Sequence, residues 1–228
     1  MEQPSNQPLP SGKRHGPTLP QIVPLGDFAL LVRFGQSLDD SANRAVLAFA
    51  ARLEADGIAG VVEIAPSLVS VLVRYDPALV GLARLSGELA LRLGGSDAPG
   101  ENRTHRIAVR FDGPDLGEVA DLLGLSIDAF VELHNRGGLR VLTTGFAPGF
   151  VYCGFHETAL TVPRRTLVRP EVAAGSVLFA AGQTAIAATD IPTGWHVIGH
   201  TEFRNFDPMA SLPTQLRAGD RVVFEVAP

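Results

Sequence analysis

The part of the sequence best suited to chemistry is residues 144–155, Thr-Gly-Phe-Ala-Pro-Gly-Phe-Val-Tyr-Cys-Gly-Phe, an uncharged stretch with three glycines, one proline and four aromatic residues. Glycine permits positive φ or a close approach of the backbone, and proline fixes φ near −65°. Such a loop could hold aromatic rings beside bare backbone N–H groups, as at the rim of a small-molecule pocket. On the pattern alone, a tight turn whose rings fill the core is equally favoured. The candidate substrate-binding residues here are Gly145, Phe146, Pro148, Gly149, Phe150 and Tyr152.

Side chains that could complete such a pocket follow turn residues further along the chain. Arginine offers a planar fork for a carboxylate or phosphate, and glutamine offers both a donor and an acceptor. Each of these residues alone is more often structural, but together with the aromatic stretch they could recognise a carboxylate or an amide. The further candidates are Arg164 and Arg169 after Pro163, Gln183 and Thr184 after Gly182, and Trp195 after Gly194.

Other reactive residue types give no complete constellation. Cys153 has no base beside it in the sequence, so we expect a small buried hydrophobe rather than a nucleophile. His196 and His200, if they lie on one strand, are separated by roughly 13 Å, which is too far to share one metal ion. The sequence has no Gly-x-Ser-x-Gly elbow, Cys-x-x-Cys pair, phosphate loop or dinucleotide fingerprint. We therefore predict no metal site, and the residue types alone assign no catalytic residue.

The composition narrows the class of protein. The chain has 228 residues, 46% of them hydrophobic and 19% charged, which is typical of a soluble globular protein of one or two domains. A net charge of −5 argues against a nucleic-acid partner. The single cysteine excludes an internal disulfide and favours a reducing, cytoplasmic location. No stretch approaches the roughly 18 apolar residues of a membrane span. Lys13 is the only lysine, so a phosphate-loop or Schiff-base lysine is excluded from the folded part.

The first half of the chain predicts a small α+β domain over residues 22–96. Residues 1–21, rich in Pro, Gln, Ser and Gly, are predicted to be a disordered tail. The domain reads as strand, helix, strand, strand, helix, an order that is ferredoxin-like in outline. The expected strands cover residues 28–34, 61–64 and 68–74; Asp39 or Asp40 caps the first helix, and the second runs from Asp76-Pro77 to Leu93. Residues 94–100 have the composition of a linker.

The second half, residues 101–228, predicts a β-rich domain. A strand over 106–111 precedes two short helices, one beginning near Gly113-Pro114 and one capped by Ser126. Short apolar runs broken by Gly and Pro follow, for example at 176–180, 195–198 and 221–226. This pattern is typical of a closed β-barrel or a β-sandwich. A barrel mouth lined by the aromatic stretch would be a reasonable ligand site.

The order of motifs in this second domain resembles the family of the 5-oxoprolinase B subunit, which is also called allophanate hydrolase subunit 1 or the sporulation-kinase inhibitor (KipI) family. The resemblance covers about residues 22–228. The segments that carry it are Gly113-Pro-Asp115, Glu132-Leu-His134, Gly145-Phe-Ala-Pro-Gly-Phe-Val-Tyr152, Pro163-Arg164, Ala174-Gly-Ser-Val177, Ala181-Gly-Gln-Thr184, Thr193-Gly-Trp195, Ile198-Gly-His-Thr201, Phe206-Asp-Pro208 and Gly219-Asp-Arg-Val-Val-Phe224.

The resemblance implies a cyclophilin-like β-barrel after the small α+β domain. It also implies partners, a homologue of the 5-oxoprolinase C subunit and possibly one of the A subunit, which together open 5-oxo-L-proline to L-glutamate with ATP hydrolysis. We therefore expect one component of a complex, inactive alone. Two alternatives stay open within the same resemblance. One is a carboxyltransferase half-domain that acts with biotin in a urea carboxylase or allophanate hydrolase system, and the other is an inhibitor that binds a sensor histidine kinase.

Six positions depart from the pattern of the family. A widened pocket and weaker recognition of an anion would follow from the loss of a tyrosine ring and an arginine. A substrate other than 5-oxoproline is therefore left open at this point. The departures are Val168 and Ala173 in place of prolines, Ala187 and Ala188 in place of a Tyr-Pro pair, Thr193 in place of a glycine, and His200 in place of an arginine.

Overall fold

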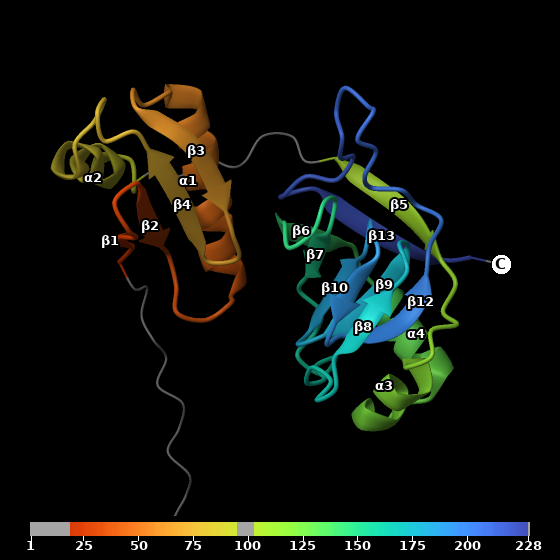
Figure 1. Ribbon diagram of the computed structural model, residues 1–228. Helices are drawn as coiled ribbons and strands as arrows, with labels where there is room; N and C mark the ends of the chain where they lie inside the picture. The colour runs from red at the N-terminus through yellow and green to blue at the C-terminus, as the bar shows by residue number, and fades with distance from the viewer. Residues whose placement is uncertain (1–18, 95–102, 228) are drawn as a thin grey trace, which may run out of the picture.

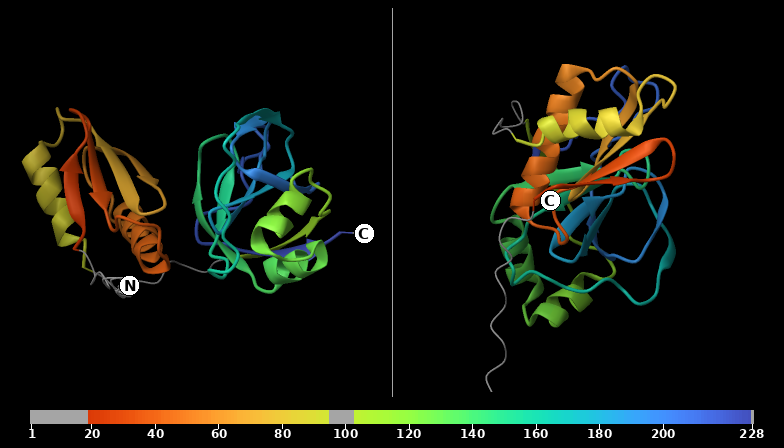
Figure 2. Two further views of the ribbon diagram at one scale, coloured as in Figure 1. Left: turned by 90° about the horizontal axis from the view of Figure 1, so that it is seen from below. Right: turned by 90° about the vertical axis from the view of Figure 1, so that its left-hand side faces the viewer.

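The computed structural model describes residues 19–94 and 103–227, which form two units, each with its own sheet and core (Figures 1 and 2). The first unit covers residues 21–91 and the second residues 104–226. The predicted tail lies outside the described residues up to position 18, and the predicted linker does so from position 95. No helix within the two described ranges is long and apolar enough to cross a membrane.

The first unit is an antiparallel sheet in the order β1-β2-β4-β3 with two helices. Residues from both helices and from the strands share one core, for example Phe49 of α1 and Leu85 of α2. Its elements are β1 (Gln21–Pro24), β2 (Ala29–Arg33), α1 (Asp40–Asp56), β3 (Val61–Pro66), β4 (Ser70–Tyr75) and α2 (Leu82–Leu91).

Capping chemistry explains where the two helices begin. The prediction for α1 is confirmed, because the Asp39 carboxylate accepts a hydrogen bond from the backbone N–H of Ala42 at 2.8 Å. The prediction that α2 begins at Asp76-Pro77 is wrong. The Asp76 carboxylate instead accepts from the N–H of Ala78 and closes a local turn, and α2 begins only after Gly81. Strand β1 is also absent from the prediction.

The second unit is a seven-stranded sheet in the order β12-β9-β10-β7-β6-β13-β5, with two helices and a separate β11-β8 pair. The sheet curls until its two edge strands approach each other, where Arg110 and His200 exchange two backbone hydrogen bonds of 2.9 Å. The expected strands and both helices are present, with shifted ends. The elements are β5 (Thr104–Val109), α3 (Leu116–Leu123), α4 (Ile127–Asn135), β6 (Leu139–Thr144), β7 (Val151–Gly154), β8 (Arg169–Val172), β9 (Ser176–Ala180), β10 (Gln183–Ile186), β11 (Ile191–Thr193), β12 (His196–His200) and β13 (Arg221–Val226).

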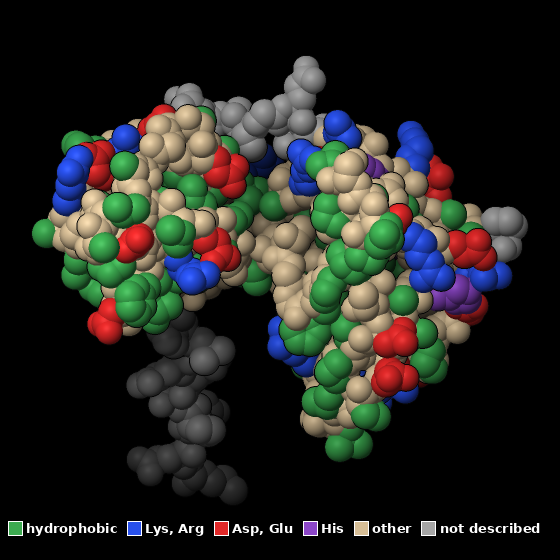
Figure 3. Space-filling view, turned by 45° about the horizontal axis from the view of Figure 1, so that its top comes forward, with side chains coloured by type: hydrophobic (Ala, Val, Ile, Leu, Met, Phe, Trp, Pro, Cys, Tyr) green, Lys and Arg blue, Asp and Glu red, His purple; other side chains and the backbone are tan. Residues whose placement is uncertain are grey.

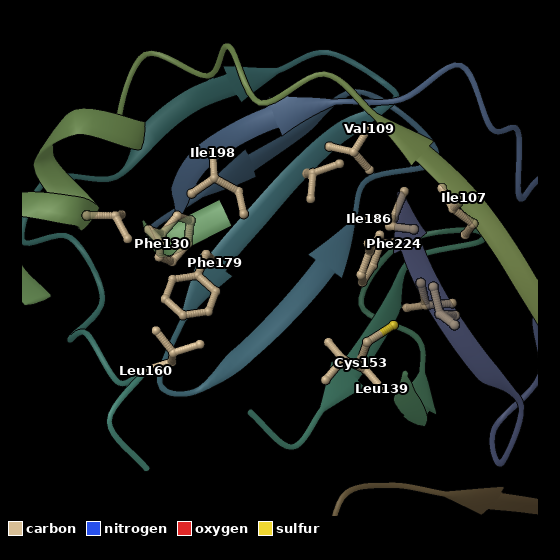
Figure 4. Close-up of a cluster of buried hydrophobic side chains, with 14 of the residues drawn as sticks. Ile107, Val109, Phe130, Leu139, Cys153, Leu160, Phe179, Ile186, Ile198 and Phe224 are labelled. Atoms are coloured by element: carbon tan, nitrogen blue, oxygen red, sulfur yellow. The ribbon is translucent and has the colours of Figure 1, made fainter. Parts of the chain in front are cut away.

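The main core of the second unit lies between the concave face of the sheet and α4. Figure 4 shows Phe130 of α4 beside Phe179 of β9, with ring centroids 5.3 Å apart. Cys153 of β7 points into the same cluster and is fully buried. Burial raises the pKa of its thiol to about 12, so the thiolate needed for nucleophilic attack is disfavoured. The prediction that Cys153 is a small buried hydrophobe is confirmed.

The two units touch through a polar contact centred on Asn43 of α1, whose side chain is fully buried. Its Nδ2 donates to the carbonyl of Leu68 at 2.9 Å and to that of Leu142 on β6 at 3.0 Å. Its Oδ1 accepts from a guanidinium nitrogen of Arg140 at 2.6 Å. Two of these three hydrogen bonds, to Leu142 and from Arg140, join a helix of the first unit to a strand of the second, and the bond to Leu68 stays within the first unit.

Replacing this amide should weaken the whole chain. We expect Asn43→Ala to lower the free energy of unfolding by about 2–3 kcal/mol, because it leaves buried carbonyls and a guanidinium nitrogen without their partner. Ser41→Ala, on the exposed side of the same helix, is the control and should change it by less than about 0.5 kcal/mol. Urea unfolding followed by circular dichroism measures both. Equal curves for the two variants would show that the contact contributes no stability.

Candidate functional site

The aromatic stretch forms a continuous series of ring contacts that ends at an arginine. The ring of Phe146 lies 5.5 Å from that of Phe150, which lies 4.8 Å from Tyr152, and Tyr152 lies 5.8 Å from Trp195, all between centroids. The guanidinium carbon of Arg164 lies 5.6 Å from the centre of the Trp195 ring. Residues far apart in the sequence are thus brought together by stacking and by a cation–π contact.

These rings border a second, smaller core on the convex side of the sheet, which we call the aromatic face. Phe150 and Trp195 fill this core, whereas Phe146 is 68% exposed and Tyr152 is half-buried. The stretch therefore combines the two predicted arrangements: some of its rings fill the core, and others are exposed as at the rim of a pocket. The buried members are Phe150, Val172, Leu178, Ala180, Ala185, Ala187, Ile191, Trp195 and Val197.

Strand register places Gln183 on the aromatic face. Ala185 of β10 lies opposite Tyr152 of β7, and Gln183, two residues away, points to the same side of the sheet. Gln183 and Tyr152 are therefore diagonal neighbours, within reach of long side chains. Gln183 is 6% exposed, and its Oε1 is buried without a hydrogen-bond partner. An unpaired buried acceptor costs stability unless a ligand or water supplies a donor.

Thr184 does not join this set, because successive residues on a strand point to opposite faces. Its side chain lies in the main core, where its Oγ1 is 2.8 Å from Nε2 of His134 and 2.8 Å from Nε2 of His156. Nδ1 of His134 donates to Asn135 Oδ1 at 2.7 Å, so its Nε2 accepts from the Thr184 hydroxyl. That hydroxyl in turn accepts from His156. The four side chains form one buried chain of hydrogen bonds, which we call the histidine chain.

Burial keeps both histidines of this chain neutral. It lowers the pKa of His134 from 6.5 to about 4. Burial, together with the nearby His134, lowers the pKa of His156 to about 3. The histidine chain was not apparent from the sequence, because His134 and His156 lie 50 and 28 residues before Thr184. Its members are neutral at physiological pH.

The segment that carries Arg164 is fixed on both sides. Nε2 of His196 donates to the carbonyl of Pro163 at 3.0 Å, and the backbone N–H of Arg165 donates to the carbonyl of Gly194 at 2.7 Å. In the described part of the chain, the Arg164 guanidinium has no carboxylate partner. Arg164 is therefore exposed, held in place and free to bind an anion.

The charge of Arg164 affects the pKa of the neighbouring Tyr152. Burial raises the pKa of its phenol, and the positive charge of Arg164 partly opposes that rise. At neutral pH the phenol is therefore protonated and can donate a hydrogen bond next to the guanidinium.

Arg169 is not available in the same way, because Asp115 engages it. The Asp115 Oδ1 accepts from Arg169 and, at 2.7 Å, from Arg165. The Oδ2 accepts from the backbone N–H of Val197 at 2.8 Å. The Asp115 side chain is 4% exposed, so one buried carboxylate holds α3, β8 and β12 together. Asp115 belongs to the Gly113-Pro-Asp motif, but the local sequence does not show that it pairs with two arginines.

The loop before β7 has positive φ angles at its glycines, as the sequence predicts. Gly149 has φ 68°, and a Cβ there would lie 2.6 Å from Phe206 Cβ and 2.8 Å from Ala188 Cβ, so only glycine fits. Gly145 also has positive φ, and so does the non-glycine Phe146 at 78°. Such values in a non-glycine residue gather at functional sites. Pro148 is exposed on the same loop.

The six positions that depart from the family pattern do not all lie at the aromatic face. Ala187 is buried in the aromatic face, Ala188 faces Gly149, and Thr193 accepts a hydrogen bond from the N–H of Trp195. Val168 approaches Gly194, and the Ala173 carbonyl closes the turn before β9. His200 instead lies at the edge of the sheet, where its Nδ1 is 2.6 Å from Asp112. The described residues contain no group of three His, Cys, Asp or Glu placed to hold a metal ion.

A family model, a curated protein and a solved structure each match most of this chain. A family model described as carboxyltransferase domain, subdomain C and D, matches residues 20–216. The 5-oxoprolinase B subunit of Bacillus subtilis (strain 168) is 35% identical over 219 residues, which cover 90% of this chain and 91% of that protein. The crystal structure of TTHA0988 has a TM-score of 0.79 at 37% identity, over 88% of this chain but only 40% of that longer one.

A more distant likeness concerns the fold alone. The Kluyveromyces lactis urea carboxylase has a TM-score of 0.74 at 16% identity, over 96% of this chain and 23% of that one. The nearer relatives confirm the resemblance drawn from the motifs. The chain belongs to the carboxyltransferase domain family, subdomains C and D, and to the family of the 5-oxoprolinase B subunits.

Proposed function

We propose that this chain is the B subunit of an ATP-dependent 5-oxoprolinase, which opens 5-oxo-L-proline to L-glutamate together with homologues of the A and C subunits. The relatives named as B subunits of 5-oxoprolinase support this proposal. The observation that carries it within this chain is the pairing of an anion-binding group with an amide-binding group on the aromatic face. Arg164 is a cation without a carboxylate partner among the described residues, and Gln183 has a buried acceptor without a donor.

The substrate matches these groups. The molecule 5-oxo-L-proline is a five-membered lactam with one N–H donor, one carbonyl and one carboxylate. Its carboxylate would bind Arg164, its N–H would donate to Gln183 Oε1, and its ring would pack against Tyr152. We find no activated nucleophile among residues 19–94 and 103–227, since Cys153 is a buried thiol and the histidine chain lies in the other core. Ring opening therefore requires groups from the partner subunits, and the chain alone would be inactive.

ATP is a substrate of the complex in this proposal. The sequence has no phosphate-binding loop, so we place the binding of ATP outside this chain's aromatic face. The proposed cytoplasmic location rests on the single, reduced cysteine. We also propose the finer fold assignment, a ferredoxin-like first unit and a cyclophilin-like second unit. The two-helix, four-stranded first unit and the curled seven-stranded sheet support it.

A carboxyltransferase half-domain acting with biotin is the second candidate, which the description of the matching family favours. The same arginine and glutamine would then hold a urea-like amide or a carboxylated intermediate. The two candidates differ in their requirements. The purified complex should open 5-oxoproline with ATP alone under the first, and should need a biotin carboxylase, biotin and bicarbonate under the second. The kinase-inhibitor alternative also stays a proposal, and the exposed apolar side chains of Phe146, Leu167 and Val168 are its support.

Arg164→Ala is expected to reduce kcat/KM of the assembled complex roughly ten- to a hundredfold, because it removes a charge-assisted contact worth about 1.5–3 kcal/mol. Stability should change by less than about 0.5 kcal/mol, since the residue is exposed and has no carboxylate partner in the described ranges. Arg84→Ala, an exposed arginine of α2, is the matched control and should leave both unchanged. If Arg164→Ala melts early and its activity only follows the folded fraction, the arginine is structural.

A further inference from the structure

The two edge strands of the second unit meet at one point and then separate. Arg110, which follows β5, and His200 at the end of β12 exchange two backbone hydrogen bonds of 2.9 Å. Before that point along β5 the strands diverge. The next contact is between the Thr201 hydroxyl and the Ala108 carbonyl, at 2.6 Å. The sheet is therefore open along the rest of β5.

The register shows which backbone groups of β5 face this opening. The N–H of Arg221 donates to the carbonyl of Arg103, and that of Ala227 to the carbonyl of Val109, both at 2.8 Å. The odd-numbered residues of β5 thus bond to β13, its parallel neighbour. The even-numbered Arg106 and Ala108 direct their backbone groups the other way. In the described part of the chain, neither their N–H groups nor the Arg106 carbonyl has a partner.

A hollow of about 340 Å³ lies along this free edge, and we call it the seam. Its walls are apolar at Phe203, which follows β12, and at the exposed Ala108 of β5, whereas the Ile107 side chain is only 1% exposed and belongs to the main core. Its rim is charged, and Figure 3 shows arginine, carboxylate and histidine side chains gathered on the side of the second unit where the chain ends. The lining residues are Arg106, Ile107, Ala108, Arg110, His200, Thr201, Glu202, Phe203 and Ala227.

The ion pairs at the rim are exposed to solvent. Arg110 is 49% exposed, and its Glu202 partner is 3.7 Å away and 92% exposed. Arg106 is 71% exposed and meets Glu225 of β13. Pairs this exposed contribute little to stability, so a carboxylate arriving along the free edge can replace either partner. The hollow therefore combines unpaired backbone groups, an apolar wall and exposed guanidinium groups whose present carboxylate partners are also exposed.

We propose that the seam binds an extended segment of a partner protein, which adds to β5 as a further strand and places an acidic side chain opposite Arg106. Main-chain hydrogen bonds give affinity in this mode of recognition, and alternate side chains give specificity. The apolar wall at Phe203 suits β-branched residues at the positions between. The segment is short, because the Arg110–His200 contact closes the edge.

A second copy of this chain fits the seam less well. In any antiparallel register across Arg106 and Ala108, an arginine of one copy comes to lie opposite or diagonal to an arginine of the other. Like charges at such positions destabilise a strand pair. The charge pattern therefore favours a different, acidic partner strand.

The test uses a labelled probe peptide, acetyl-Thr-Val-Glu-Val-Thr-amide, and its twin with lysine in place of glutamate. The full chain is titrated with each peptide, and amide hydrogen exchange is followed by NMR. At about 1 mM peptide, the glutamate probe should slow exchange at Arg106 and Ala108 several-fold and leave Ile107, already bonded to β13, unchanged. The lysine twin should bind at least several-fold more weakly.

Two variants make the result specific. Ala108→Pro removes one free-edge N–H without touching the ladder to β13 and should weaken binding roughly tenfold, whereas Ala108→Ser keeps the N–H and should bind as the parent does. Arg106→Glu should reverse the preference between the two peptides, and it serves as the test if the proline variant does not fold. The proposal is overturned if neither peptide protects Arg106 and Ala108, if Ala108→Pro binds like Ala108→Ser, or if the chain alone forms a dimer that protects these amides.

Discussion

Acidification from pH 7 to about pH 4.5 is expected to unfold the second unit while the first unit remains folded. The cause is the buried histidine chain. In the unfolded chain His134 and His156 take up protons near pH 6.5, whereas in the folded chain they do so only near 4 and 3. Because the folded pKa values are lowered, this stabilisation is fully present above pH 6.5 and is lost as the pH falls from there toward 4.

The expected loss is large. Two protons taken up on unfolding change the stability by up to about 2.7 kcal/mol per pH unit. A loss of several kcal/mol by pH 4.5 is comparable to the total stability of about 5–15 kcal/mol of a typical domain. Residues 22–94 contain no histidine, so the first unit has no such dependence and serves as an internal control.

The single tryptophan makes the two units separable in one experiment. Trp195 reports only on the second unit, while far-UV circular dichroism reports on both. The Trp195 fluorescence transition should come first as the pH falls. His156→Gln, which keeps a donor toward Thr184 but does not titrate, should roughly halve the slope of stability against pH between 6.5 and 5. A flat stability over that range, or an unchanged slope in the variant, would contradict the role given to the histidines.

Asp115→Ala is expected to lower the free energy of unfolding by about 3–5 kcal/mol, the typical cost of removing one partner from a buried ion pair. The Asp115 carboxylate is nearly inaccessible to solvent and binds two arginines and one backbone N–H. Its loss leaves Arg165 and Arg169 beside each other without this shared counter-charge. Chemical denaturation followed by Trp195 fluorescence measures the effect.

The control for Asp115 lies on the adjoining helix. Asp121 of α3 is exposed, and Asp121→Ala should change stability by less than about 0.5 kcal/mol. A second variant separates charge from packing, because Asp115→Asn keeps the shape and an acceptor for the Val197 N–H. It should fall between the parent and the alanine variant. If the asparagine variant is as stable as the parent, the two arginines do not depend on the negative charge.

Several elements of the fold follow from local chemistry and were therefore predictable. Caps at Asp39 and Ser126 fix the starts of α1 and α4, and apolar runs fix β9 and β13. Strand β1 (Gln21–Pro24) was missed because it ends in proline and continues a polar tail, so only pairing with β2 makes it a strand. The start of α2 was missed because Asp76 offers the same cap to a turn as to a helix.

The candidate site was predictable where the argument was local and failed where it needed pairing across the sheet. The series from Phe146 to Trp195 and the position of Arg164 beside it could be anticipated only as a group of residue types. That Gln183 and Thr184 point to opposite faces follows from strand geometry alone, and could have been foreseen. Arg169 pairs with Asp115, which lies 54 residues away. The sequence around either residue does not predict this pair.

The parallel pairing of β5 with β13 also affects how the chain folds during synthesis. Thr104 pairs with Arg221, more than a hundred residues later, whereas all strands of the first unit lie within residues 21–75. At a ribosomal rate of about 5–20 residues per second, β5 waits roughly 6 to 23 seconds for its neighbour to emerge. The first unit can complete its sheet in that interval. The nascent second unit meanwhile exposes both edges of β5, and chaperone binding is therefore expected to matter most in this interval.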